Sequence, residues 1–330
     1  MEFVIEEADD LSEFQHAWKN IMSRYYWYKK NRIFDWNKDN ELKDMERRFN
    51  EPESCYLIAR MKESSDIVGI LRISTGGRNA QLERWEPTVL DEQSHLHIAV
   101  ALIEEAIEKA RQREKLSVRC TIKVPSGTDY AHWHQELLNE MGFVDISGEM
   151  TELLLKLPND SYVIPTFKDV VLSDANTHSA EDIARLTVDC FTGTEEDLRI
   201  HGSDQSVTNY EVALQRGRII FANEEFHSPP EFWRFAEYEG IPIGVVGGLI
   251  PCRNADPLTG NLCLVGLLPA HRRRGITSML IHSVLNSLIE HGCKYATVGT
   301  PTINYPAISM YEKLGFVDHS RLNWLIKSLD

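Results

Sequence analysis

The chain has 330 residues, of which 42% are hydrophobic and 26% charged, and its formal net charge is −15 at pH 7. This length favours two domains, because single hydrophobic cores rarely grow beyond roughly 250–300 residues. The negative charge disfavours non-specific binding to nucleic acid or anionic membranes and mildly favours cationic partners. The six cysteines form no Cys-x-x-Cys pair and no zinc-like spacing with histidine, so we expect reduced thiols and no bound metal.

The first residues, Met1-Glu-Phe-Val-Ile-Glu-Glu, lack the basic and apolar regions of a signal peptide. No apolar run approaches the roughly 20 residues that span a bilayer. We therefore expect a cytoplasmic protein without a membrane partner.

The first half alternates segments with helical and strand patterns. Residues 10–28 carry apolar and aromatic side chains at helical spacing, which predicts a buried helix face. The apolar segments 55–60 and 67–73 flank a polar stretch and predict a hairpin. An amphipathic helix is expected at 97–111. The remaining predicted elements are a strand at 118–124, a helix at about 131–141 and two short strands that end at residue 157.

The second half repeats this order, with a helix at 180–189, a hairpin that turns at Glu239-Gly240 and a last strand at 322–327. Gly142-Phe143 corresponds to Gly315-Phe316, and Ile67-Val-Gly69 to Pro242-Ile-Gly244, at offsets of 173 and 175 residues. Recurring offsets of this size indicate a tandem duplication. We expect one domain at 1–160 and a second at 161–330.

Between the second hairpin and the last strand, an apolar run ends at Pro269, a basic turn follows, and a helical pattern begins near Met279. A strand, a tight loop and a helix N-terminus in this order point several backbone N–H groups at one spot, and the helix dipole adds positive charge there. Arg272, Arg273 and Arg274 strengthen a preference for phosphate, and Gly275 lets it approach the backbone. Taken alone, the stretch also fits an ordinary turn with a solvated basic cluster.

Two stretches together resemble the GNAT superfamily of acyl-CoA-dependent N-acyltransferases. The family's loop reads Gln/Arg-x-x-Gly-x-Gly/Ala and binds the pyrophosphate of coenzyme A; here Arg272-Arg-Arg-Gly-Ile-Thr277 fits except for Thr277. The second stretch, Asn304-x-x-Ala-x-x-x-Tyr-x-x-x-Gly-Phe316, matches the family's run in full. The resemblance implies an α/β fold of two tandem GNAT-like domains, each a mostly antiparallel mixed sheet flanked by helices.

The resemblance also implies that acetyl-CoA is the acyl donor. A splayed central strand, with a local bulge compatible with Gly266, would lend backbone N–H groups to the thioester and pantetheine, and the basic loop would hold the pyrophosphate. Asn304 would bond the cofactor's amide chain, or else cap the helix that follows. The cofactor-binding residues so implied are Gly266, Leu267, Leu268, Arg272, Arg273, Arg274, Gly275, Ile276, Thr277, Ser278, Asn304 and Tyr311.

Tyr311 is the expected general acid, because a phenol with a pKa near 10 is protonated at neutral pH. Its alternative role is that of a packing tyrosine. Where some family members carry a glutamate on the central strand, this chain has Asn261-Leu-Cys263, so no base is visible there. Glu196 is the candidate base, within an acid-rich segment that also holds Glu195, Asp197 and His201 and that equally fits a solvated loop.

The first half differs where chemistry would take place. At the position of the basic loop it has Val89-Leu-Asp-Glu-Gln-Ser-His95, which is acidic and contains no glycine, and Leu138 stands where Tyr311 stands. We therefore expect residues 1–160 to form a degenerate domain without coenzyme A and residues 161–330 to form the catalytic domain.

The function expected from the resemblance is N-acetylation of a primary amine on a small, cationic molecule such as a metabolite or an antibiotic. Two alternatives stay open: acetylation of protein or peptide amines, and a non-catalytic acyl-CoA sensor. The sequence leaves a monomer and a homodimer equally open, and it predicts no nucleic-acid partner.

Overall fold

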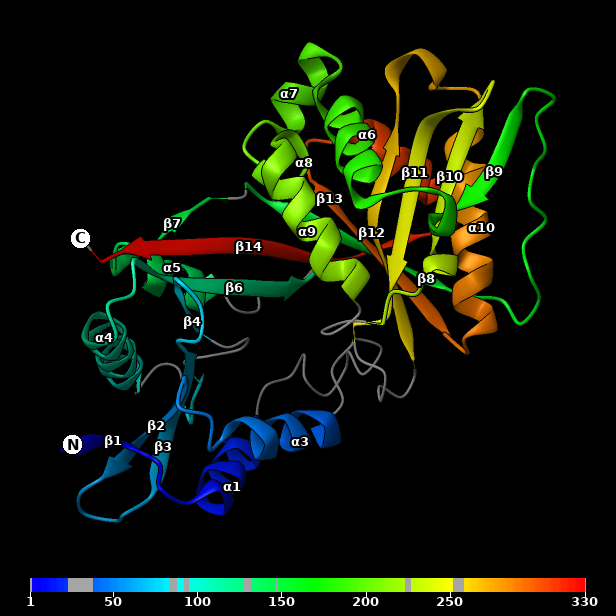
Figure 1. Cartoon of the computed structure of the whole chain (residues 1–330). Coiled ribbons are helices and arrows are strands. Elements are labelled where there is room, and N and C mark those ends of the chain that lie inside the picture. Colours follow the sequence, from blue (N-terminus) through cyan, green and yellow to red (C-terminus); the bar gives the residue numbers. More distant parts are fainter. Residues whose placement is uncertain are drawn as a thin grey trace. The chain divides into compact units, whose positions relative to one another are not determined.

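The computed structural model describes residues 2–22, 38–82, 88–91, 95–126, 132–146, 148–222, 227–251 and 258–329. The chain forms two compact units, the first from Met1–Glu149 together with Ser320–Asp330 and the second from Met150–His319 (Figure 1). Among the helices in these described ranges, none is long and apolar enough to cross a membrane.

Unit 1 is built on a sheet in the order β1-β2-β3-β4-β6-β14, with β5 beside β3 and β7 beside β14. Its pairs are antiparallel except for the parallel pair β4 and β6. The elements are β1 (Phe3–Glu7), α1 (Leu11–Met22), α3 (Lys38–Arg48), β2 (Ser54–Met61), β3 (Ile67–Ser74), β4 (Ala80–Leu82), β5 (Thr88–Val89), α4 (Leu96–Gln112), β6 (Ser117–Pro125), α5 (His132–Glu140), β7 (Val144–Asp145) and β14 (Val317–Ser328).

Unit 2 is built on a sheet in the order β8-β13-β12-β11-β10-β9, in which only β12 and β13 are parallel. Its elements are β8 (Met150–Lys156), β9 (Val170–Asp174), α6 (Ala180–Thr192), α7 (Glu195–His201), α8 (Gln205–Thr208), α9 (Tyr210–Ala222), β10 (Trp233–Tyr238), β11 (Ile241–Leu249), β12 (Thr259–Leu267), α10 (Ile276–Glu290), β13 (Tyr295–Pro301) and α11 (Tyr305–Lys313). The mixed, mostly antiparallel sheets confirm the fold class expected from the sequence.

Glycines let helices pack closely on both faces of the unit 2 sheet. A Cβ on Gly266 would lie 3.1 Å from Cβ of Cys190 in α6, whereas one on Gly260 would lie 2.5 Å from Leu288 in α10. The helix α6 thus covers one face, with α9 packed against it, and α10 covers the other (Figure 1). Leu280, Val284 and Leu288 of α10 are fully buried in this core, which fixes the N-terminus of α10 at the end of β12.

Each half of the chain contributes its last strand to the other unit. The strand β8, at the end of the first half, pairs with β13 from Tyr295↔Lys156 to Pro301↔Met150. The strand β14, at the end of the second half, pairs with β6 from Ser320↔Pro125 to Ser328↔Ser117. The compact units therefore differ from the chain halves 1–160 and 161–330 by an exchange of equivalent strands.

The duplication is visible in matching backbone details. In unit 1 the β2–β3 register shifts between Ala59↔Gly69 and Arg60↔Ile67, and in unit 2 the β10–β11 register shifts in the same way between Ala236↔Gly244 and Glu237↔Pro242.

The turn after the last helix of each half is also the same. Phe143 N–H donates to Leu138 O and Phe316 N–H donates to Tyr311 O, while Gly142 and Gly315 adopt φ values of 84° and 92°. Leu138 is therefore the structural counterpart of Tyr311.

Most elements expected from the patterns are present, including both hairpins and the helix at 97–111, which is α4. The helix expected at 10–28 ends at Met22 within the described residues, and the rest of that prediction lies outside them. The acid-rich segment expected as a possible loop forms α7, and the helices α8 and α9 were not predicted.

Candidate active site

The loop between β12 and α10 exposes a run of backbone N–H groups. A short 3-10 turn, Pro269–His271, precedes it, and positive φ values of 62° at Arg273 and 84° at Gly275 turn the chain into the helix. Arg272 N–H donates to Pro269 O and Met279 N–H donates to Gly275 O, but the N–H groups of residues 273–278 donate to none of the described residues. Six adjacent free donors at a helix N-terminus form an anion-binding arrangement.

Arg273 and Arg274 are exposed and pair with no carboxylate in the described part of the chain. Thr277 and Ser278 lie half-buried in the first turn of α10. At Gly275 any side chain would be strained by the positive φ, and a Cβ there would lie 3.2 Å from the Phe167 ring. The two arginines and the small residues of the first helical turn therefore surround the same free N–H groups.

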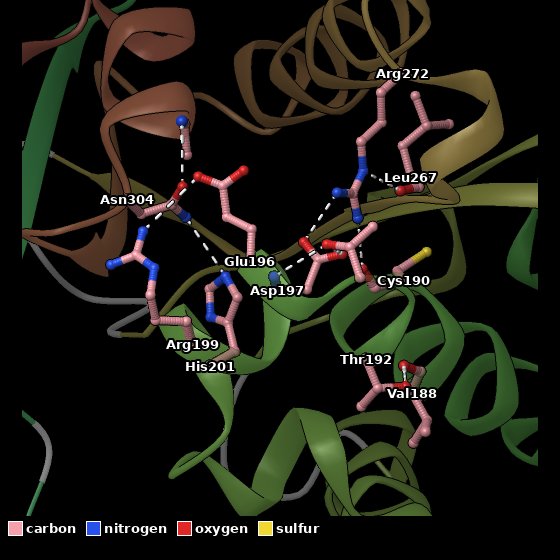
Figure 2. Close-up of polar contacts among 12 residues, drawn as sticks. Val188, Cys190, Thr192, Glu196, Asp197, Arg199, His201, Leu267, Arg272 and Asn304 are labelled. Atoms are coloured by element: carbon pink, nitrogen blue, oxygen red, sulfur yellow. Dashed lines mark hydrogen bonds and ion pairs between the residues drawn. The ribbon is translucent and has the colours of Figure 1, made fainter.

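Arg272 has a different role from its two neighbours. Its Nε donates to Leu267 O at 3.0 Å, its Nη2 donates to Cys190 O at 2.7 Å, and its Nη1 pairs with Asp197 Oδ1 at 2.9 Å. Figure 2 shows the guanidinium reaching from the loop to α6 and α7. All three bonds are to the protein itself, so Arg272 ties the end of β12 to these two helices.

Asp197 is held in place for this contact. Its carboxylate accepts from the hydroxyl of Thr194 at 2.7 Å, and that hydroxyl in turn accepts from the Asp197 backbone N–H, which caps α7. The Asp197 side chain is only 12% exposed. Sequence reasoning assigned this residue to an acidic surface segment and missed its partner, which lies 75 positions along the chain.

The strands β12 and β13 diverge within the sheet. They run in register only from Thr259↔Tyr295 to Leu262↔Val298, after which β12 continues beside β11 and β13 beside β8. From Cys263 to Leu267 the edge of β12 that faced β13 pairs with no strand that the structure describes, and we call it the unpaired edge. A splayed central strand was expected from the resemblance.

Strand geometry decides which N–H groups lie on the unpaired edge. Leu268 N–H donates to Ile243 O of β11. Because hydrogen-bonding direction alternates along a strand, Gly266 also faces β11, whereas Val265 and Leu267 face the unpaired edge. The carbonyl of Leu267 agrees, since it accepts from Arg272. The bulge lies at Cys263, where the β11–β12 register shifts opposite Gly247 and Gly248, and not at Gly266 as expected.

Asn304 caps α11. Its side-chain oxygen accepts from Ala307 N–H at 3.3 Å, which is the capping role left open by the sequence. Its amide nitrogen donates to Thr300 Oγ1 at 2.9 Å and lies 3.5 Å from Nε2 of His201. The start of α11 and the end of α7 are therefore in contact (Figure 2).

Tyr311 is only 4% exposed, and its ring packs edge-on against Phe316 with the centroids 5.7 Å apart. Burial raises the pKa of its phenol well above the usual value of 10. The hydroxyl donates to none of the described residues.

Glu196 and His201 have different environments although both belong to α7. The Glu196 side chain is 62% exposed and pairs with Arg199 at 3.7 Å. His201 is half-buried, with its ring edge-on to Phe191, and burial lowers the pKa of its imidazole below the usual 6.5. His201 is thus a neutral imidazole at neutral pH.

Arg216 of α9 was not singled out by the sequence. Its Nη1 donates to Ser206 Oγ at 2.8 Å and its Nη2 to Cys263 O at 3.3 Å, at the bulge of β12. The only sequence signal is an arginine among apolar residues of a helix, which does not show what it contacts.

The described residues before α4 in unit 1 are arranged differently from the loop before α10. Before α4, Asp91 N–H donates to Nδ1 of His95, and His95 N–H donates back to Asp91 O. Asp91 adds a carboxylate at this helix start. In the described residues of both units, no group of three or more His, Cys, Asp or Glu side chains is arranged to hold a metal ion.

Comparisons with known proteins agree with this geometry. Residues 188–316 match the model of the Acetyltransferase (GNAT) family. The chain is 30% identical over 78 residues to the N-alpha-acetyltransferase MAK3 of Arabidopsis thaliana and 40% identical over 91 residues to the N-alpha-acetyltransferase 60 of Drosophila melanogaster. These alignments cover 23% and 27% of this chain and 41% and 33% of the two relatives, so the chain spans less than half of either relative's length.

Two solved structures resemble the whole chain. A tandem GNAT protein from the clavulanic acid biosynthesis pathway covers 100% of it with a TM-score of 0.59 and 16% identity, and 98% of that protein is covered. A GCN5-related N-acetyltransferase from Sphaerobacter thermophilus covers 99% of it with a TM-score of 0.66 and 12% identity, and 96% of that protein is covered. Together with the two motifs and the diverging strands, these similarities confirm the predicted resemblance to the GNAT superfamily: residues 188–316 match the family model, and the whole chain shares the fold of tandem GNAT proteins.

Proposed function

We propose that this protein transfers an acetyl group from acetyl-CoA to a primary amine of a small molecule, and that unit 2 alone binds the donor. One observation carries the proposal: the free N–H groups of residues 273–278, flanked by Arg273 and Arg274, lie directly beyond the unpaired edge of β12. A phosphate group fits the loop, and an extended amide chain fits the edge of a strand that lacks its neighbour.

In this proposal the backbone of Gly275, Ile276, Thr277 and Ser278 binds the pyrophosphate, and Arg273 and Arg274 supply positive charge. The residues of β12 that face the unpaired edge, Val265 and Leu267, hold the chain that carries the thioester. Gly266 and Leu268 support this edge through their pairing with β11. Arg272 positions the loop and does not itself need to contact phosphate. Acetyl-CoA supplies the activated acyl group.

Tyr311 would act as the general acid that protonates the leaving thiolate. Its raised pKa keeps the phenol protonated across the physiological range, as an acid requires. Its burial and its packing on Phe316 fix the ring, which reduces the conformational cost of proton transfer.

Two groups of α7 are candidates for accepting a proton from the amine. Glu196, expected from the sequence, is exposed and paired with Arg199. His201 is neutral and half-buried, and it lies beside Asn304 at the N-terminus of α11. A neutral imidazole can take a proton at pH 7 with little cost, so we favour His201 and retain Glu196 as the alternative.

The acceptor is a cation before it reacts, because free amines are protonated at neutral pH. The net charge of −15 and the exposed carboxylates of α7 and the turn after it favour its approach. These carboxylates belong to Glu195, Glu196 and Asp204.

Acetylation of peptide N-termini is the second candidate, because both curated relatives described above are named N-alpha-acetyltransferases. A panel of small amines and a panel of short peptides with free N-termini, each assayed for release of coenzyme A, separates the two.

The proposal is tested by calorimetric titration of acetyl-CoA into the wild-type protein and an Arg273→Ala/Arg274→Ala variant. The double variant loses two charged contacts to phosphate, so we expect its affinity for acetyl-CoA to fall about 10- to 100-fold. An Arg185→Ala/Lys294→Ala variant loses the same charge at exposed sites outside the loop and is the matched control. Absence of binding to the wild type, or equal binding to all three proteins, contradicts the proposal.

A further inference from the structure

Arg216 is a half-buried cation whose hydrogen-bond partners among the described residues are neutral. Its guanidinium donates to the hydroxyl of Ser206 and to the carbonyl of Cys263. It forms no ion pair with any carboxylate in the described part of the chain. A guanidinium has five N–H donors, so donors remain after these two bonds.

The same helix shows what an ordinary surface arginine does. Two residues further along α9, Arg218 is 58% exposed and pairs with Glu181 of α6 at 2.7 Å. Arg218 thus has a counter-ion, whereas Arg216 points to the sheet and has no counter-ion among the residues that the structure describes. Partial removal of a charge from water without a partner costs free energy, which a bound anion would offset.

Arg216 reaches the unpaired edge of β12 at the end opposite to the basic loop. Cys263 is the bulge residue directly after the last β12–β13 pair, and Leu267 lies at the loop end of the edge. At a rise of roughly 3.3 Å per residue these ends are about 13 Å apart, with Val265 midway. Each end has a carbonyl bound by an arginine. Arg272 is paired with Asp197, whereas none of the described carboxylates pairs with Arg216.

The geometry points to a carboxylate on the acceptor as the missing partner of Arg216. Given the proposed function, in which the donor lies along the unpaired edge from the loop, the acceptor meets the edge near Val265 and Cys263. A planar guanidinium binds a carboxylate through two parallel N–H donors, which fixes the orientation of the acceptor as well as its position. The acceptor class is then a zwitterion with an amine and a nearby carboxylate, as in an amino acid or the C-terminal residue of a short peptide.

The experiment compares matched acceptors on the full chain saturated with coenzyme A. The probes are alanine, phenylalanine, lysine and glutamate, each beside its α-amide, which keeps the amine and removes the charge of the α-carboxylate. Calorimetry gives the affinity of each probe, and acetyl-CoA turnover gives kcat and KM where a probe reacts. The variants are Arg216→Gln, which keeps hydrogen-bonding groups for Ser206 and Cys263, and Arg218→Gln as the control on the same helix.

We expect at least one acid to bind the wild type about 10- to 100-fold more tightly than its amide. In Arg216→Gln we expect the preference for the acid over its amide to be lost because KM for the acid rises, while kcat on the amide and the affinity for acetyl-CoA stay unchanged. In Arg218→Gln the preference should be retained. The inference is overturned if acids and amides bind alike, if no acid binds, or if Arg216→Gln weakens acids and amides equally. Failure of the proposed function is separate, since it shows as loss of acetyl-CoA binding or turnover with every acceptor.

A dipeptide whose free carboxylate lies one residue further from the amine distinguishes the two sources of the carboxylate. Tighter binding of the amino acid than of the dipeptide assigns Arg216 to a free amino acid. The reverse order, with loss of dipeptide binding in Arg216→Gln, assigns it to a peptide and still supports a carboxylate ligand.

Discussion

Nη1 of Arg272 lies 2.9 Å from Oδ1 of Asp197, and this ion pair joins the loop after β12 to the helix α7. The Arg272 side chain is 35% exposed and the Asp197 side chain only 12% exposed, so solvent screens the pair incompletely. Because α7 also carries the proposed proton acceptor His201, the pair couples the geometry of the loop to that of the acceptor side. This coupling leads to the first prediction.

Replacing Asp197 with Ala leaves Arg272 with two neutral partners and removes the carboxylate to which the Thr194 hydroxyl donates, whereas the cap bond from the backbone N–H of residue 197 is retained. We expect the free energy of unfolding to fall by about 1–3 kcal/mol, the usual cost of losing a charged hydrogen-bond partner in a partly buried site. Urea unfolding followed by circular dichroism measures the change. Glu196→Ala, one residue earlier and exposed, is the control and should change stability by less than about 0.5 kcal/mol. Equal effects of both changes would show that the ion pair contributes nothing.

Tyr311→Phe removes one hydroxyl from a buried ring. The Phe316 contact is retained, so we expect no loss of stability and no change in the affinity for acetyl-CoA. The turnover number should fall about 10²- to 10⁴-fold if the phenol is the general acid. Steady-state kinetics on the best acceptor found, with calorimetry on the same protein, separates the two effects. Unchanged turnover would make Tyr311 a packing residue, as Leu138 is in unit 1.

We expect an acid limb in the pH–rate profile, because His201 is the proposed proton acceptor. Burial lowers its pKa below 6.5, so the neutral imidazole persists in the folded protein as the pH falls through 6.5. Activity should therefore hold through pH 6.5 and be lost only at lower pH, when the folded imidazole protonates. The unfolded chain binds that proton first, so the contribution of His201 to stability is present above pH 6.5 and decreases below it.

The measurement is kcat/KM from pH 5 to 8 for the wild type and His201→Asn, with an NMR titration of the imidazole. His97→Asn, at an exposed site in unit 1, is the control and should leave the profile unchanged. A wild-type acid limb that survives in His201→Asn would assign it to another group, with Glu196 tested next.

Much of the fold was predictable because its signals are local. The glycines beside the two bulges, Gly69 and Gly244, and those of the two turns, Gly142 and Gly315, recur at similar offsets of 175 and 173 residues, so their correspondence is visible in the sequence. The exchange of β8 and β14 was not predictable, because the residues of a strand show that it is a strand and not which sheet it joins.

The candidate site also combines residues with a local sequence signal and residues without one. The basic loop and Asn304 are contiguous motifs, and their positions followed from residue type and spacing. Arg216 and Asp197 bind groups that lie 47 and 75 positions away, so their roles depend on how the helices pack and not on their neighbours in the chain. The N–H groups that face the unpaired edge belong to Val265 and Leu267, and not to Gly266 and Leu268 as expected. The difference arises because the alternation of N–H direction starts from the bulge at Cys263, and no residue type in the sequence marks that bulge.

The number of donor sites per chain tests the difference between the two units. In unit 2 the N–H groups of residues 273–278 donate to none of the described residues, whereas before α4 of unit 1 Asp91 N–H donates to His95 Nδ1 and His95 N–H donates to Asp91 O. A pyrophosphate would meet repulsion from the Asp91 carboxylate there and would find these two donors occupied, so calorimetry should give one molecule of acetyl-CoA per chain. Gly275→Glu should abolish that site, because it forces a side chain into a left-handed backbone and brings a carboxylate to the phosphates. Gly292→Glu is the control, since it imposes the same strain and charge at a positive φ of 85° outside the loop and should retain binding. Two molecules per chain, or one that survives Gly275→Glu, would place the donor in unit 1.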